Sequence, residues 1–224
     1  RRVLFRSLKG ALQKAEKRHY AAITEPAQLA PLLRAIDGYM GHLYSRTALK
    51  LTPLVFVRPG ELRTAEWVEI DFDAAEWRIP AAKMKMANDH IVPLSEQAIA
   101  LLREVQPISG HGKYVFPSIR TGERPMSENT VNSALRVMGY DTKVEVCGHG
   151  FRTMACSSLV ESGIWTEDAI ERQMSHKEQN NVRAAYTHKA KHITQRRLMI
   201  QWWADYLDAN KERHIMPFDF AKML

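Results

Sequence analysis

Residues 67–94 read WVEIDFDAAEWRIPAAKMKMANDHIVPL, and this stretch is the main evidence for the fold class. It contains three groups of β-forming residues, which turn-forming residues separate. Because the groups are short and follow one another closely, they predict a small three-stranded antiparallel sheet. The predicted tip of the last hairpin is Ala87-Asn88-Asp89, and Lys83 and Lys85 lie close to it. The β-forming residues are Trp67, Val68, Ile70 and Phe72, then Trp77 and Ile79, then Ile91 and Val92.

On both sides of this stretch, apolar residues recur at the spacing that is typical of helices. The segment from about Leu43 to Val57 is apolar almost all round, which predicts a helix at the centre of the core. The chain is therefore predicted to have an α+β fold that is mainly α-helical with one small three-stranded antiparallel sheet. Further helices are predicted from Pro26 to about Tyr39, from Pro59 for one short turn, after Ser95, after Ser127, over residues 150–162, and from about Lys191 to Leu207.

The charge of the chain is concentrated at its beginning. The formal net charge is +7, and residues 1–20 hold seven Lys or Arg and one Glu, which is +6 and leaves +1 for the rest. A basic balance of this kind suggests a polyanionic partner such as nucleic acid. The segment either follows phosphates or forms a solvated linker, so charge alone does not establish DNA binding.

Several classes of protein are excluded by what the sequence lacks. Cys147 and Cys156 are too few for a disulfide framework and are not spaced as zinc ligands. We find no apolar run long enough to cross a bilayer, and therefore expect a cytoplasmic protein with no membrane partner. Neither an acidic cluster with metal-ligand spacing nor a phosphate-binding Gly-Lys-Ser/Thr loop occurs, so we expect no metal and no ATP.

The most informative short motif is Cys147-Gly148-His149-Gly150-Phe151-Arg152. His149 and Arg152 are three residues apart and share a face if a helix begins there, and an imidazole beside a guanidinium suits a phosphate. Arg58 lies upstream, and His176 and Tyr186 lie downstream. Taken singly, each has an ordinary structural interpretation, such as a surface ion pair, a core histidine or a packing tyrosine.

The ordered set of these residues resembles the signature of the tyrosine recombinases, also called phage integrases, and most closely those of satellite-phage type. The resemblance covers nearly the whole chain and includes the runs RHYAAI at 18–23, HGFR at 149–152 and WADYL at 203–207. It implies the catalytic-domain fold of that family. It also implies that Tyr186 attacks the scissile phosphate and forms a 3′-phosphotyrosyl bond with a free 5′-hydroxyl.

The chemistry of the residues agrees with that implication. Arg58 and Arg152 carry rigid forks that can hold two phosphate oxygens each. His149 and His176 can donate hydrogen bonds to the same phosphate or accept the phenol proton. A tyrosine hydroxyl has a pKa near ~10, so Tyr186 needs this positive field in order to attack as a phenolate.

Two supporting roles follow from the same pattern. Glu61, three residues after Arg58, is expected to orient that arginine or a histidine. The departing 5′-oxygen needs a proton, and a lysine on the hairpin suits this role. Lys83 and Lys85 share a face of an extended strand, so alternation does not choose between them. The resemblance of Met84-Lys85-Met86, followed by residues 90–94, to the family's hairpin assigns the role to Lys85.

The resemblance also implies a domain organisation and partners. Residues 1–22 are expected to be a basic linker or the end of a missing N-terminal DNA-binding domain, 23–209 the catalytic domain, and 210–224 a C-terminal tail that docks on its own domain or on an adjacent protomer. The implied partners are double-stranded DNA attachment sites, a homo-tetramer formed on DNA, and accessory DNA-bending proteins. The implied location is the bacterial nucleoid.

Two alternatives remain beside the recombinase. A type IB topoisomerase uses similar chemistry without joining two sites, and the satellite-phage resemblance argues against it. A DNA-binding regulator of the same fold without catalysis is the alternative from another class. Retention of the whole ordered set favours an enzyme, because the fold alone does not require those residues.

Overall fold

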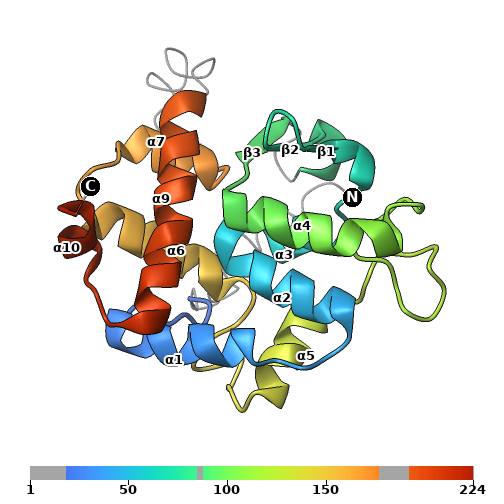
Figure 1. Ribbon diagram of the computed structural model, residues 1–224, viewed down its shortest axis with the longest axis horizontal. Helices are drawn as coiled ribbons and strands as arrows, with labels where there is room; N and C mark the ends of the chain where they lie inside the picture. The colour runs from blue at the N-terminus through green and yellow to red at the C-terminus, as the bar shows by residue number, and fades with distance from the viewer. Residues whose placement is uncertain (1–18, 85–87, 177–191, 224) are drawn as a thin grey trace, which may run out of the picture.

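The computed structural model describes residues 19–84, 88–176 and 192–223 (Figure 1). Lys85 and Tyr186 lie outside these ranges. Most of the described chain is helical, with one small sheet, which confirms the predicted fold class. No helix in these ranges combines the length and the apolar character needed to cross a bilayer. The helices are α1 (Pro26–Asp37), α2 (Leu43–Val55), α3 (Pro59–Arg63), α4 (Glu96–Ser109), α5 (Thr130–Val137), α6 (Gly150–Glu161), α7 (Glu167–Gln173), α9 (Ile193–Glu212) and α10 (Pro217–Ala221), with the 3-10 turns η1 (Trp67–Glu69) and η2 (Ala81–Lys83).

The sheet has the strand order β1-β2-β3, and both pairs of neighbours are antiparallel, as predicted. Trp77 pairs with Val92 across the last two strands. Trp77 and Ile79 are buried while Arg78 between them is exposed, which is the period of two that a half-buried strand requires. The strands are β1 (Ile70–Asp71), β2 (Glu76–Ile79) and β3 (His90–Pro93).

The first strand begins later than the sequence predicted. Trp67 and Val68 belong to the turn η1, and Val68 is 90% exposed, so its preference for strands finds no neighbour to pack against. Glu69 holds the turn in place. Its carboxylate accepts hydrogen bonds from the Glu66 backbone at 3.2 Å and from the Trp77 indole at 3.0 Å. These contacts outweigh the local preference of the two residues.

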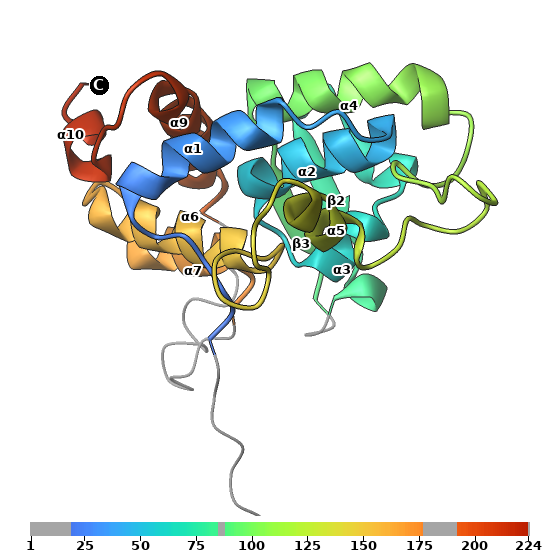
Figure 2. The ribbon, with the colours of Figure 1, turned by 90° about the horizontal axis from the view of Figure 1, so that it is seen from below.

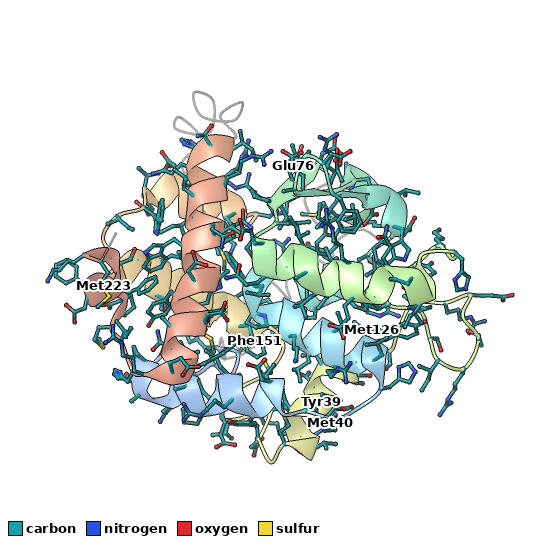
Figure 3. The ribbon with its side chains drawn as sticks, in the orientation of Figure 1. Tyr39, Met40, Glu76, Met126, Phe151 and Met223 are labelled. Carbon is teal, nitrogen blue, oxygen red and sulfur yellow. The ribbon has the colours of Figure 1, made fainter. Side chains whose placement is uncertain are left out.

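Helix α2 lies at the centre of the molecule, as its apolar sequence predicted. It packs most closely against α4 and α5, and it also contacts α1, α6 and α9. Phe151 of α6 is fully buried where these helices meet (Figure 3). Phe56 ends α2 with a φ of 33°, in the left-handed region, so the helix stops two residues before the predicted end at Val57.

Helix α9 crosses α1 near its own C-terminal end and packs against it (Figure 1). Trp203 and Tyr206 are fully buried, and the Trp203 indole donates a hydrogen bond to the carbonyl of Pro53 in α2 at 2.8 Å. The predicted end at Leu207 is too early, since the helix continues to Glu212. Its last turns are held by polar contacts to neighbouring helices.

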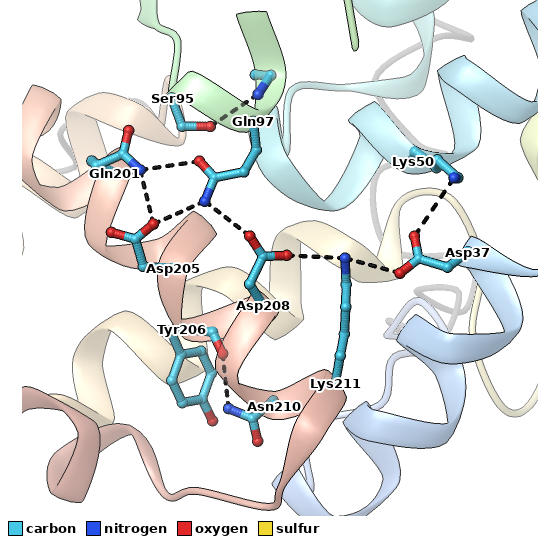
Figure 4. A network of polar contacts seen from close by, with 11 residues as sticks. Asp37, Lys50, Ser95, Gln97, Gln201, Asp205, Tyr206, Asp208, Asn210 and Lys211 are labelled. Atoms are coloured by element: carbon cyan, nitrogen blue, oxygen red, sulfur yellow. Dashed lines mark hydrogen bonds and ion pairs between the residues drawn. The ribbon is translucent and has the colours of Figure 1, made fainter. Parts of the chain in front are cut away.

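These polar contacts join α9 to α4 and α1 (Figure 4). The Gln97 amide donates to Asp205 at 2.8 Å and to Asp208 at 3.0 Å. Lys211 forms ion pairs with Asp208 at 2.9 Å and with Asp37 at 3.0 Å. Each pair is partly exposed and contributes little to stability alone. Together the contacts fix the position of α9 relative to α4 and α1.

The C-terminal residues fold back on the chain's own core. Helix α10 packs against α6, and the Phe220 ring lies 5.5 Å from the rings of Trp202 and Tyr206. Ile215 is buried, and its carbonyl accepts the Tyr206 hydroxyl at 3.1 Å. Of the two destinations expected for the tail, the structure shows the first, docking on its own domain.

Candidate active site

Arg58 is held at the N-terminus of α3 by Glu61. Its backbone N–H donates to Glu61 Oε2 at 2.8 Å, and its guanidinium Nη1 donates to Glu61 Oε1 at 2.7 Å. Pro59 fits the first position of this helix because it lacks an N–H that would go unpaired there. A third contact runs from Nη2 to the carbonyl of Ser175 at 3.0 Å. Glu61 is buried, so a paired carboxylate fixes the direction of the guanidinium.

Arg152 lies in the first turn of α6 and is almost completely buried. Its Nη1 donates to the carbonyl of Phe56 at 2.7 Å and its Nη2 to that of Met174 at 2.6 Å. Burial, and then repulsion from Arg58, lower the pKa of Arg152 to about 10. The group is still charged at neutral pH. The two guanidiniums therefore meet at the turn after α7, because they bind the adjacent carbonyls of Met174 and Ser175.

His149 stands at the N-terminus of α6 and is half-buried. Burial, Arg152, Arg58 and His176 lower the pKa of its imidazole, and Glu61 opposes them. The neutral form therefore dominates at pH 7. Among contacts with described residues, we find no hydrogen bond to this ring, but the Tyr20 ring packs against it at a tilt, with centroids 3.9 Å apart.

His176 follows α7 and is paired with Glu171. Its Nδ1 lies 2.8 Å from Glu171 Oε2, and its backbone N–H donates to the Glu171 carbonyl at 3.1 Å. A carboxylate can only accept, so Nδ1 carries the proton and Nε2 is left for other partners. Ser175, with a φ of 51°, makes the bend that turns His176 back toward the helix. Glu171 was not predicted from the sequence. The feature that could have indicated it is an acidic residue five positions before the histidine.

The structure separates the two hairpin lysines. Lys83 donates to the Thr64 carbonyl at 2.8 Å, forms an ion pair with Glu66 at 2.7 Å, and forms another with Glu69. Burial works to lower its pKa, but the hydrogen bonds and charges of the two glutamates outweigh burial and raise the pKa. Lys83 is thus occupied in holding η1 and η2 together. Lys85 lies outside the described residues, as does Tyr186.

Tyr206 is fully buried and donates its hydroxyl to Ile215. Burial raises its pKa to about 12. A phenol that is both covered and harder to ionise than usual is unsuited to attack on DNA. The tyrosine nearest in sequence to the predicted nucleophile therefore has a structural role in the core.

One buried cation beside the site was missed from the sequence. Arg196 of α9 donates to Gln173 Oε1 from Nε at 2.9 Å and from Nη2 at 2.7 Å, and its Nη2 also contacts the carbonyl of Ile91 in β3. His90 lies beside it, and burial together with Arg196, Arg152 and Arg58 lowers the pKa of this histidine to about 3. Arg196 thus joins β3, α7 and α9, an arrangement that no local spacing predicts.

The arrangement gathers two guanidiniums and two imidazoles from α3, α6 and the end of α7. Helices α3 and α7 lie on the side of the molecule away from α4 and α9 (Figure 2). Within the described ranges, no group of three or more His, Cys, Asp or Glu side chains could hold a metal ion. The site presents positive charge and hydrogen-bond donors, which suits a phosphate group.

The family model named "Phage integrase family" matches residues 23–192. The chain belongs to this family. The phage integrase of Enterobacteria phage P4 is 53% identical over 218 residues, which cover 92% of this chain and 49% of that protein. The IntB protein of Escherichia coli strain K12 is 54% identical over 226 residues, which cover 96% of this chain and 57% of that protein. The chain therefore spans about half the length of these relatives.

Solved structures of phage integrases share the fold. The integrase from mycobacterium phage Brujita matches with a TM-score of 0.60 and 14% identity, over 87% of this chain and 61% of that one. A lambda integrase tetramer bound to a Holliday junction matches with a TM-score of 0.54 and 17% identity, over 76% of this chain and 51% of that one. The expected recombinase fold is confirmed.

Proposed function

We propose that this chain is the catalytic domain of a site-specific DNA recombinase, the integrase of a prophage or genomic island. The observation that carries the proposal is the convergence of Arg58 and Arg152 on the turn before His176, with His149 beside them. Buried contacts of Arg152 and partly buried contacts of Arg58 hold both guanidiniums before any substrate arrives. Such preorganised charge is the main requirement for stabilising a phosphoryl-transfer transition state.

The two arginines bind the non-bridging oxygens of the scissile phosphate. A guanidinium has five N–H donors. In contacts with described residues, Arg58 and Arg152 each use two nitrogen atoms, so further donors are left for a ligand. His176, with its Nδ1 proton held by Glu171, and His149 complete the cradle.

Tyr186 supplies the nucleophile in this proposal. Its oxygen forms a bond to phosphorus while the bond from phosphorus to the 5′-oxygen breaks. The phenol proton passes to a histidine, for which neutral His149 is suited, and the 5′-oxygen takes a proton from Lys85. The phosphotyrosyl bond keeps the energy of the broken bond, so a 5′-hydroxyl of another strand can reverse the reaction without metal or ATP.

The proposed partners are double-stranded attachment sites, further copies of the chain in a tetramer on DNA, and accessory DNA-bending proteins. The lambda integrase in the matched structure forms a tetramer on a Holliday junction, which supports an assembly of this kind here. We also propose residues 1–22 as a linker, 23–209 as the catalytic domain, 210–224 as the tail, and the nucleoid as the location. The family match begins at residue 23, which supports the first boundary.

The test traps the covalent intermediate. The substrates are duplexes with the sequence found at both ends of the element that carries the gene. Each carries a nick close to the cleavage site, so that the short cleaved fragment diffuses away and the protein stays bound to the DNA. We expect a protein–DNA adduct from the unaltered chain and none from Tyr186→Phe, with equal DNA affinity. Absence of any adduct would favour a non-catalytic regulator. Adducts without joining of two duplexes would favour a topoisomerase-like enzyme.

A further inference from the structure

The segment before α1 is fastened to the start of α6. The Cys147 N–H donates to the carbonyl of Ala21 at 3.0 Å, and Ile23 is buried in the core. The approach is so close that a Cβ at position 150 would lie 2.0 Å from the Ala21 oxygen, so only glycine fits at Gly150. Figure 2 shows this segment running beside α6 before α1 begins. The backbone at Ala21 therefore has a defined place beside His149.

Tyr20 precedes this anchored residue and reaches the imidazole. Its ring centroid lies 3.9 Å from that of His149, with 34° between the planes. Tyr20 is 62% exposed, so the contact is not a by-product of burial in the core. In the described part of the chain the imidazole has no hydrogen bond to fix its rotation, and the tilted Tyr20 ring lies against it.

We infer that Tyr20 is a positioning residue for His149, which holds the imidazole by stacking in the orientation that the reaction needs. The inference rests on the proposed function, because that function gives His149 its task. Stacking depends on the aromatic ring and not on the hydroxyl. A misplaced catalytic group loses rate more than affinity, because its geometry acts in the transition state.

The experiment compares Tyr20→Phe with Tyr20→Leu in the 224-residue chain. The rate of adduct formation on the nicked duplexes is measured at saturating DNA. We expect Phe to stay within about twofold of the unaltered chain and Leu to lose about tenfold, with less than twofold change in apparent affinity. In a His149→Asn background, Tyr20→Leu should cause no further loss, since the two residues act together.

A second measurement is independent of catalysis. The carbon-bound protons of the His149 ring are observed by NMR without DNA. Stacking on Tyr20 or Phe shifts these signals upfield, and Tyr20→Leu should move them downfield while the unfolding temperature is unchanged. Three outcomes would overturn the inference. They are a His149 signal that does not move in Tyr20→Leu, a loss of rate in Tyr20→Phe as large as that in Tyr20→Leu, and a further loss of rate from Tyr20→Leu in the His149→Asn background. If the unaltered chain forms no adduct, the proposed function fails and the catalytic part of the inference fails with it, while the NMR signal still reports whether the rings stack.

Discussion

Single residues orient the catalytic groups that we propose, and Glu171 does so for His176. The hydrogen bond at 2.8 Å joins two partly exposed side chains, so its loss should change stability by less than about 0.5 kcal/mol. We expect Glu171→Ala to slow adduct formation about three- to tenfold, and Glu171→Gln, whose amide oxygen still accepts, to slow it less. Glu167→Ala, at the exposed start of the same helix, is the control. Equal rates for all of these variants would remove Glu171 from the site.

The two hairpin lysines offer a matched pair for testing the proton donor. Lys85→Ala should cleave normal DNA slowly. Its cleavage rate should recover on DNA whose bridging 5′-oxygen is replaced by sulfur, because sulfur is a leaving group that needs no proton donor. Lys83→Ala should show no such recovery. It should instead lose about 1–3 kcal/mol of unfolding free energy in urea, because buried Glu69 loses the cation that balances its charge. Equal defects of Lys85→Ala on both substrates would mean that Lys85 positions DNA and that the proton comes from elsewhere.

At the scale of elements, an aromatic cluster helps to hold α10 on the core. The Phe220 ring packs against both Trp202 and Tyr206, whereas Phe218 of the same short helix is 54% exposed. Phe220→Ala should therefore cost about 2–3 kcal/mol of stability, at the low end for a large side chain because it is only half-buried. Phe218→Ala should cost less than about 0.5 kcal/mol. Similar losses for both, measured by urea unfolding, would show that the tail is not docked as the structure describes.

At the scale of the whole molecule, the charge is divided between a basic beginning and a nearly balanced remainder. Residues 1–20 account for +6 of the net +7. The chain should bind duplex DNA weakly and with a steep salt dependence, because binding to phosphates releases counterions. Each phosphate that the protein neutralises contributes about 0.9 to the slope of log affinity against log salt concentration. Removing residues 1–18 should therefore make this slope less steep by about 2 to 5. Tight binding that salt does not weaken would contradict this division of roles.

The amino-acid sequence alone was sufficient to predict the fold class, the family and the set of candidate residues. These follow from features that are local in the chain. Groups of β-forming residues between turns predict strands over residues 67–94, the apolar run before Arg58 predicts a central helix, and the order of motifs from Arg58 to Tyr186 identifies the family. Local spacing carries this information because side-chain direction repeats with the period of each element.

The tertiary structure was needed to show which groups hold the candidates in place. Arg58 meets the Ser175 carbonyl across 117 positions, and Arg152 meets that of Phe56 across 96. Lys83, which alternation could not separate from Lys85, is identified as structural by glutamates that the fold brings beside it. Such partners depend on how helices and strands pack against one another, and the energy of packing is shared by residues far apart in the chain, so no local pattern records it.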